Sequence, residues 1–117
     1  MDVADGAPAA ARKRIVFLRS EIKSPPFTLA GRIVAGRALG SLQEGRALAM
    51  PISRPMPSIG PRCHELRIRD ENHYWRIVYR IDPKAILVVA VFPKATRKTP
   101  KTAIALCQAR LARFDAP

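Results

Sequence analysis

The sequence predicts an α+β domain: an antiparallel or mixed sheet of about four strands, two N-terminal helices packed on one face, and a C-terminal helix. Three β-patterned runs lie close together between residues 63 and 92 and are joined by short turn-forming segments. Apolar residues at helical spacing occur before them, over residues 25–45, and again after residue 99. These observations define the expected class.

The N-terminal part predicts a tail, a strand and two helices. Residues 1–11 are alanine-rich without a core pattern, so we expect a flexible tail on a single domain formed by residues 1–117. Arg14–Leu18 contains a β-branched, aliphatic and aromatic run that is typical of a buried strand. A helix is expected from Pro25, capped by the preceding serine, to near Gly45, followed by a short second helix over residues 46–50.

The segment from Pro51 to Arg62 is rich in proline, which excludes regular structure and predicts an extended connector. Its functional alternative is a proline-rich ligand for another domain. Because the prolines are irregularly spaced, a stiff loop that positions Arg62 beside the sheet is favoured.

Three strands are expected next, over Cys63–Arg69, Tyr74–Ile81 and Ile86–Phe92. Their short polar connectors predict an antiparallel meander, and the third strand, apolar on both faces, should be central. Thr99 and Pro100 open the last helix. Its expected apolar stripe is Ile104, Cys107, Leu111 and Phe114, whereas Lys101 and Arg110 point away.

The alternation of the first two of these strands gathers cations on one face of the sheet. Successive strand residues point to opposite faces, so Leu66, Trp75 and Ile77 define a core face. We expect the other face to be open and to present its cations to an anion. Its polar residues are Glu65, Arg67, Arg69, Tyr74, Arg76 and Arg80.

The charge balance points to a polyanionic partner. The chain has 21 Lys and Arg against 9 Asp and Glu, a formal net charge of +12. The alternative is a basic surface that merely keeps the protein in solution. The 2 cysteines are too few for a disulfide framework, no secretory signal is evident, and the longest apolar run, residues 86–92, is too short to span a bilayer. We therefore expect a cytoplasmic protein with no membrane partner.

Two C-terminal motifs carry a resemblance to a known family. They are the strand Trp75–Ile81, with its Arg76, and the stretch Phe92–Pro100, which follow Glu65-Leu66-Arg67 in a β-α-α-β-β-β-α order. Over residues 14–114 the chain resembles the RelE/ParE superfamily of type II toxins, and within it the phage-derived HigB-like branch. The resemblance implies a RelE-like fold and a toxin that cleaves mRNA, usually on the ribosome. It also implies a cognate antitoxin, often a helix-turn-helix protein.

RNA is cleaved when a 2′-hydroxyl of the RNA attacks the adjacent phosphate, and the reaction passes through a phosphorane with extra negative charge. Fixed cations can stabilise this charge without a metal or cofactor. The resemblance places Arg76 on the family's arginine, as the residue that holds the scissile phosphate; a solvated surface arginine is the alternative. Arg67 matches a basic residue on the preceding strand and would flank Arg76. Lys94 matches the basic residue that ends the third strand, as an acid for the 5′-oxygen or as a point charge.

The sequence does not decide which residues transfer protons during cleavage. Glu65 is a candidate general base, and the alternative is an ion pair with a neighbouring arginine. His64 falls on the core face, which favours a satisfied core or edge histidine. His73, in a hairpin loop, is a candidate RNA contact or a solvated side chain, and Tyr74 is a candidate for stacking on a base. Many relatives carry a C-terminal tyrosine or histidine, and this chain has neither after Tyr79.

A basic cluster of Arg97, Lys98 and Lys101 lies at the start of the last helix, where we expect contacts with the RNA backbone. Arg62, Arg69 and Arg80 complete the expected RNA-binding set. The cysteines and histidines lack paired metal-ligand spacing, and no cofactor is expected.

Two other functions compete with the nuclease. One is a ParE-like toxin that inhibits DNA gyrase by protein contact and needs no cationic catalytic cluster. The other is a non-catalytic RNA-binding protein that uses the same basic face for affinity only. Fold class by itself does not separate these three functions.

Overall fold

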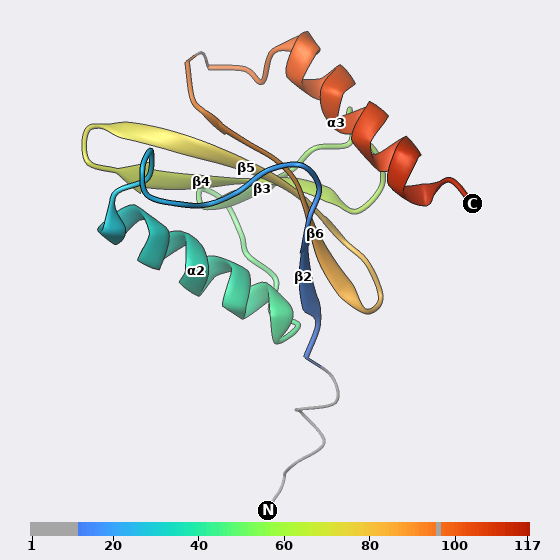
Figure 1. The fold of residues 1–117 in the computed structure, drawn as a ribbon, viewed down its shortest axis with the longest axis horizontal. Helices are drawn as coiled ribbons and strands as arrows, with labels where there is room; N and C mark the ends of the chain where they lie inside the picture. Colours follow the sequence, from blue (N-terminus) through green and yellow to red (C-terminus); the bar gives the residue numbers. More distant parts are fainter. Residues whose placement is uncertain (1–11, 96) are drawn as a thin grey trace, which may run out of the picture.

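The computed structural model describes residues 12–95 and 97–117, so the expected N-terminal tail lies outside the described residues. Its centre is a five-stranded mixed sheet in the order β2-β6-β5-β4-β3, with helix α2 on one face and helix α3 on the other (Figure 1). The strands are β2 Arg14–Phe17, β3 Ser53–Pro55, β4 Cys63–Asp70, β5 His73–Ile81 and β6 Ala85–Pro93. The α+β class is confirmed.

Helix α2, Leu29–Gln43, begins later than predicted. Pro25 precedes another proline, and a residue in that position is disfavoured in helical conformation. The cap is Thr28, whose hydroxyl accepts a hydrogen bond from the Gly31 amide at 3.0 Å and donates to the carboxylate of Asp70. A residue of β4 therefore helps to fix the first turn of α2.

The expected second N-terminal helix, over residues 46–50, is absent from the structure. Gly45 has a φ of 87°, in the left-handed region that glycine adopts readily, and it stops α2 near the predicted place. Five residues before a proline are too few to sustain a separate helix. Leu48 of this segment instead packs against the core on the α2 side.

The proline-rich connector contains a short strand, which corrects the prediction that it has no regular structure. β3 pairs antiparallel with β4, with Ser53 opposite Leu66 and Pro55 opposite His64. β3 is at the edge of the sheet, where a proline is tolerated because only one side of the strand needs partners. This strand makes the sheet five-stranded rather than four-stranded.

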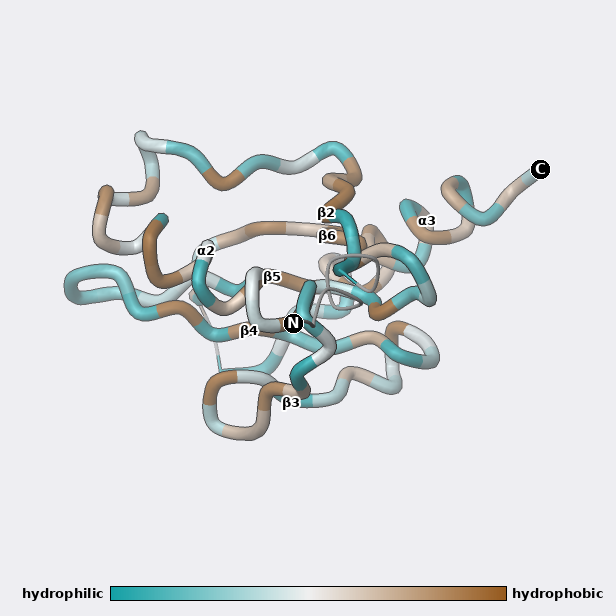
Figure 2. The backbone as a smooth tube through the Cα atoms, turned by 90° about the horizontal axis from the view of Figure 1, so that it is seen from below, coloured by the Kyte–Doolittle hydropathy of each residue, from teal (hydrophilic) through white to brown (hydrophobic). Residues whose placement is uncertain are grey.

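The antiparallel meander of β4, β5 and β6 is confirmed. β6 lies inside the sheet, where it pairs antiparallel with β5 and parallel with β2. The β4–β5 register sets Arg67 opposite Arg76 and Arg69 opposite Tyr74. Figure 2 shows that the turn between β4 and β5 is hydrophilic, whereas brown stretches lie within the strands. The predicted arginine face is therefore formed by residues that are direct neighbours across two strands.

Both faces of the sheet are covered by a core, which corrects the expectation of one open cationic face. The α2 side buries Trp75, Ile77 and Tyr79 as predicted. On the opposite side, Val78 and Val89 pack with Cys107 and Leu111 of α3, Lys101–Asp115. Only the part of the polar face beyond α3 and its preceding loop is left for a ligand.

The apolar stripe of α3 is only partly buried. Cys107 and Leu111 are buried, whereas Phe114 is 45% exposed. Arg110, expected to point away, donates a hydrogen bond from its guanidinium to the Val89 carbonyl oxygen at 2.8 Å. Its long side chain reaches back to the sheet, which helical spacing alone does not reveal.

Candidate nucleic-acid interface

Four of the predicted site residues line one surface depression of about 340 Å³: Arg67, Arg69, Tyr74 and Lys94. We call it the cationic depression. The Arg67 amide donates to the Ile52 carbonyl oxygen at 2.8 Å, so the residue before β3 forms one wall. The Lys94 amide donates to the Tyr74 carbonyl oxygen at 2.8 Å and fixes the start of the loop after β6. Backbone contacts thus bring the cations of β4 and of the loop after β6 together.

The Tyr74 ring lies close to two of these cations. The guanidinium carbon of Arg69 is 5.6 Å from the centroid of its ring, and Nζ of Lys94 is 5.7 Å from it. Both distances are within the range of cation–π attraction. The Arg69 guanidinium also donates to the Tyr74 hydroxyl at 3.5 Å. Tyr74 is 37% exposed, so an aromatic ring and fixed cations are offered to the solvent together.

A buried polar network lies beside the depression, beneath the loop that leads to α3. The Thr99 hydroxyl donates to one carboxylate oxygen of Glu65 at 2.6 Å, and the Arg76 guanidinium donates to the same hydroxyl at 3.1 Å. Nε of Arg76 is 3.7 Å from the other carboxylate oxygen of Glu65. We call these three residues the Glu65–Arg76–Thr99 network.

Arg76 is 1% exposed, and its guanidinium also donates to the Arg97 carbonyl oxygen at 2.8 Å. Burial lowers the pKa of Arg76, an effect that the adjacent Glu65 opposes. Arg54 of β3 adds a second cation, with its Nε 3.5 Å from the Glu65 carboxylate. The side chain expected to hold a phosphate is thus committed to holding the loop in place.

Glu65 is 0% exposed and forms ion pairs with Arg54 and Arg76. The alternative stated for it from the sequence, an ion pair with a neighbouring arginine, is therefore what the structure contains. A carboxylate enclosed in this way does not contact a substrate in this conformation. Arg67, by contrast, is half-buried and faces the depression.

The basic cluster after β6 is exposed. Arg97 and Lys98 lie in the loop before α3, and Lys101 begins the helix. Two hydrogen bonds of the buried network, through the Arg97 carbonyl and the Thr99 hydroxyl, attach this loop to β4 and β5. The exposed cations are consequently carried by a segment with a buried anchor.

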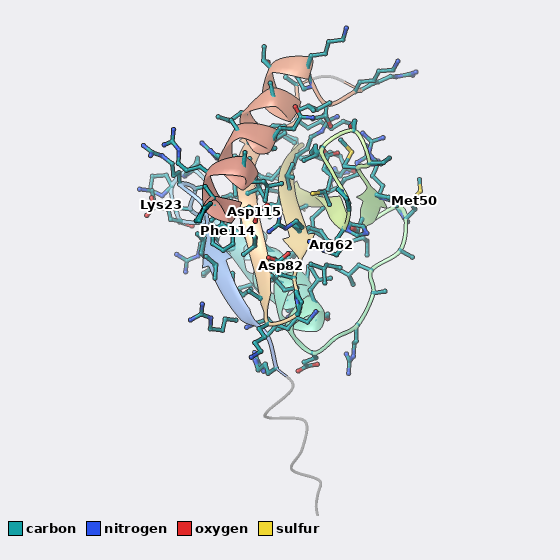
Figure 3. All side chains as sticks on the ribbon, turned by 90° about the vertical axis from the view of Figure 1, so that its right-hand side faces the viewer. Lys23, Met50, Arg62, Asp82, Phe114 and Asp115 are labelled. Atoms are coloured by element: carbon teal, nitrogen blue, oxygen red, sulfur yellow. The ribbon has the colours of Figure 1, made fainter. Side chains whose placement is uncertain are left out.

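Two of the expected RNA-binding arginines lie at the opposite end of the β4–β5 hairpin. Arg80 is 8% exposed and donates to Asp82 and Asp115, which raises its pKa. Arg62 lies 3.7 Å from the Asp82 carboxylate. Figure 3 shows Arg62, Asp82 and Asp115 gathered near the end of α3. This group attaches α3 to the sheet and is separate from the cationic depression.

The histidines lie on the core side. The His73 ring meets Trp75 edge-on at 5.4 Å between centroids, and the His64 ring stacks on Tyr79 at 5.2 Å. His64, expected as a core or edge histidine, is half-buried on the core side of β4. His73, expected in the hairpin loop, is instead the first residue of β5. Within residues 12–95 and 97–117, no three His, Cys, Asp or Glu side chains are grouped to hold a metal.

Neither described helix has the length and apolar character that crossing a membrane requires.

Sequence reasoning missed three contributors: Ile52, Arg54 and Thr99. Thr99 was interpreted only as the opening of the last helix, yet its hydroxyl joins Glu65 to Arg76. Arg54 and Ile52 lie in the segment interpreted as a connector. No alternation marked this segment as a strand, because Ile52 and Arg54 fall on the same face and differ in polarity.

The fold and the site together define an α+β protein with a five-stranded mixed sheet and a cationic depression at one side of it. The family model described as "Phage derived protein Gp49-like (DUF891)" matches residues 27–112, and the chain belongs to this family. It is a toxin-like family of toxin–antitoxin systems. The matched range runs from just before α2 into α3 and includes every residue of the cationic depression. No curated protein matched the chain.

Proposed function

We propose that this protein is the toxin of a type II toxin–antitoxin system, in the HigB-like branch of the RelE/ParE superfamily. Its activity is metal-independent endoribonuclease cleavage of mRNA on the ribosome, in the cytoplasm, and a helix-turn-helix antitoxin silences it. The observation that carries the proposal is the cationic depression, where Arg67, Arg69 and Lys94 surround Tyr74. Membership of a toxin-like family supports the same class.

The depression offers the two kinds of contact that single-stranded RNA needs. An exposed aromatic ring stacks on a base, and guanidinium and ammonium groups bind phosphates. Arg67 and Lys94 are the proposed catalytic cations: they stabilise the charge that develops on the phosphorane when the 2′-hydroxyl attacks. Lys94 is also the candidate acid for the 5′-oxygen, since its ammonium can release a proton more readily than the guanidiniums that line the same depression.

Arg76 and Glu65 receive a revised role within this proposal. Because both are buried, they act through the loop that carries Arg97 and Lys98 rather than on the phosphate itself. They are positioning residues. Arg97, Lys98 and Lys101 extend the basic surface along the RNA backbone. Each phosphate of a single strand that they neutralise should steepen the plot of log binding constant against log salt concentration by about 0.7.

The test is inducible expression in a bacterial host with mapping of RNA 5′ ends. Wild type is expected to arrest growth and to create new mRNA ends, and Arg67→Ala combined with Lys94→Ala should abolish both. The matched control is Arg32→Ala combined with Arg37→Ala, which removes two exposed cations from α2 and should leave cleavage unchanged.

Two outcomes would favour the competing functions. Growth arrest with double-strand DNA breaks and intact mRNA would identify a gyrase inhibitor and overturn the nuclease. Salt-sensitive RNA binding by wild type without new 5′ ends would identify a non-catalytic RNA-binding protein.

A further inference from the structure

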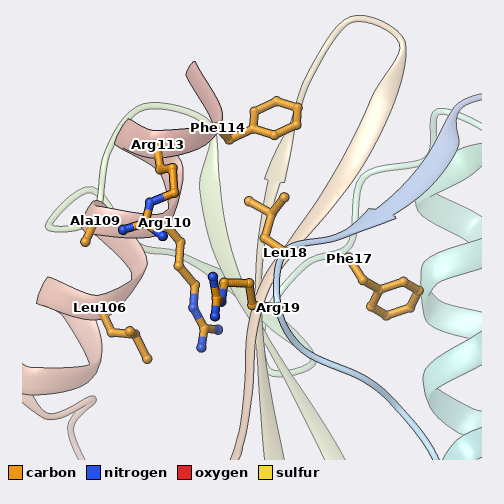
Figure 4. Close-up of a pocket in the computed structure, with 8 residues that line it drawn as sticks. All are labelled: Phe17, Leu18, Arg19, Leu106, Ala109, Arg110, Arg113 and Phe114. Atoms are coloured by element: carbon orange, nitrogen blue, oxygen red, sulfur yellow. The ribbon is translucent and has the colours of Figure 1, made fainter. Parts of the chain in front are cut away.

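A second, apolar hollow lies between α3 and the end of β2. Its volume is about 370 Å³, and we call it the α3 trough. Figure 4 shows side chains of α3 on one side of it and those of β2 and the following residues on the other. β2 and β3 are the two edges of the sheet, so the trough and the cationic depression lie toward opposite edges. The apolar residues of the trough are Phe17, Leu18, Leu106, Ala109 and Phe114.

The trough is a concentration of exposed apolar surface. Phe17 is 45% exposed, Leu106 46% and Phe114 45%. These three are a third of the large hydrophobic side chains that are exposed among the described residues. Single exposed apolar residues are common on protein surfaces, but contiguous apolar patches usually mark a site that binds another molecule.

The trough continues along α3 toward its N-terminus. A neighbouring hollow of about 450 Å³ shares Arg19, Leu106 and Arg110 with it and adds Phe92 and Ala103. The one carboxylate in that extension, Glu21, lies 3.0 Å from Nζ of Lys23. Together the two hollows follow most of the length of a helix of 15 residues.

The rim of the trough is cationic. Arg19, Arg110 and Arg113 line it, and no carboxylate does. Arg110 donates to the Val89 carbonyl oxygen, whereas Arg19 and Arg113 are exposed and form no ion pair with another described residue. An occupant that neutralises this rim must carry acidic side chains beside its apolar ones.

The residues of α3 that line the trough are spaced for contact with a second helix. Leu106, Arg110 and Arg113 follow one another at intervals of four and three, which is one seam of a helix. We propose that the α3 trough binds an acidic amphipathic helix of a partner protein. Apolar residues at intervals of three and four fill the trough, and flanking Asp and Glu meet Arg19 and Arg113. This partner is the antitoxin, an assignment that rests on the proposed function.

The first test measures binding of a synthetic peptide to the purified protein by fluorescence anisotropy. The probe is an amphipathic peptide of about 15 residues, matched to the length of α3, with leucines on one face and glutamates beside them. Wild type should bind it, and Leu106→Ser and Arg113→Glu should each weaken binding at least about tenfold. A peptide with lysine in place of glutamate should not bind.

Matched control variants come from α2. Leu29 is 63% exposed, and Arg32 is also exposed. Leu29→Ser and Arg32→Glu make the same two substitutions as the trough variants, but outside the trough, and should leave peptide binding unchanged. Equal binding by wild type and the trough variants would overturn the proposal, as would failure of wild type to bind the acidic peptide. Because Leu106 is exposed, its variant should keep the wild-type unfolding midpoint.

The second test separates the antitoxin assignment from the proposed function. The Leu106→Ser variant should still arrest growth but should escape rescue by co-expression of the proposed antitoxin, whereas Leu29→Ser should be rescued. Full rescue of Leu106→Ser would overturn the assignment while leaving the toxin activity intact. If wild type fails to arrest growth, the proposed function falls, and the peptide measurement still decides whether the trough is a docking site.

Discussion

The guanidinium of Arg76 donates to the backbone carbonyl of Arg97 at 2.8 Å, so a buried residue of β5 holds the loop that carries exposed cations to α3. The contact joins two positions that are 21 residues apart in the chain. The loop is therefore positioned by the sheet and not only by its own sequence. The buried groups around this loop and around α2 therefore determine whether the exposed cations are correctly placed.

Arg76→Ala should be strongly destabilising. It removes the cation 3.7 Å from the buried carboxylate of Glu65, and breaking a buried ion pair typically costs about 3 to 5 kcal/mol. Urea denaturation measures the loss. Adding Glu65→Gln to Arg76→Ala should recover part of it, because the buried carboxylate, which then has Arg54 as its remaining ion-pair partner, is no longer charged. Arg69→Ala, on the adjacent strand but exposed, should change stability by less than about 0.5 kcal/mol.

Thr99→Val should lower the free energy of unfolding by about 1 to 3 kcal/mol, since the Glu65 oxygen at 2.6 Å then loses its hydroxyl donor within a buried site. Thr99→Ser keeps the hydroxyl and should retain most of the stability. Thermal unfolding of both variants provides the comparison. Equal losses for valine and serine would assign the effect to packing of the methyl group instead.

Gly31→Ala should be destabilising although alanine favours helices. A Cβ at position 31 would lie 2.6 Å from Cγ of Asp70, whose carboxylate is held by hydrogen bonds from Thr28 and Trp75. Gly36 is the matched control: nothing lies within 4 Å of a Cβ built there, so Gly36→Ala should stabilise the protein by about 0.5 to 1 kcal/mol. Opposite signs for the two variants in denaturant unfolding are the expected result.

Trp75→Ala should cost about 3 to 5 kcal/mol, the usual loss for a buried aromatic side chain. Trp75 is 6% exposed and stacks on Phe27 with ring centroids 4.2 Å apart. Tyr74→Ala, one residue earlier and on the other face, should cost much less because its ring is partly exposed. A melting temperature unchanged by Trp75→Ala would contradict the assignment of the faces of β5.

Stability should fall at acid pH through Asp70. Hydrogen bonds, above all from the Thr28 side chain, hold the pKa of Asp70 below its ordinary value of 3.8. A carboxyl group whose pKa is depressed on folding contributes stability above its unfolded value, and the contribution is lost as pH falls through the folded value. The difference in unfolding free energy between wild type and Asp70→Asn should therefore be largest above about pH 5 and should shrink below pH 3.8.

The local sequence was sufficient to predict the meander and its faces. Alternation over β4 and β5 separated Trp75 and Ile77 from Arg67 and Arg76, and the structure keeps that separation. Alternation could not show that α3 covers part of the polar face. It therefore placed Arg76 and Arg67 in one open row, although the structure buries the first and leaves the second in the cationic depression.

The sequence by itself determined the α+β class, the three-stranded meander, the C-terminal helix and the basic character of the surface. These depend on spacing and charge, which are local properties of the chain. Only the tertiary structure decided which cations are exposed, where α2 begins, and that Arg54 and Thr99 join Glu65 and Arg76. Those features depend on contacts between distant segments, because burial and hydrogen bonding decide whether an arginine on a strand meets solvent or a carboxylate.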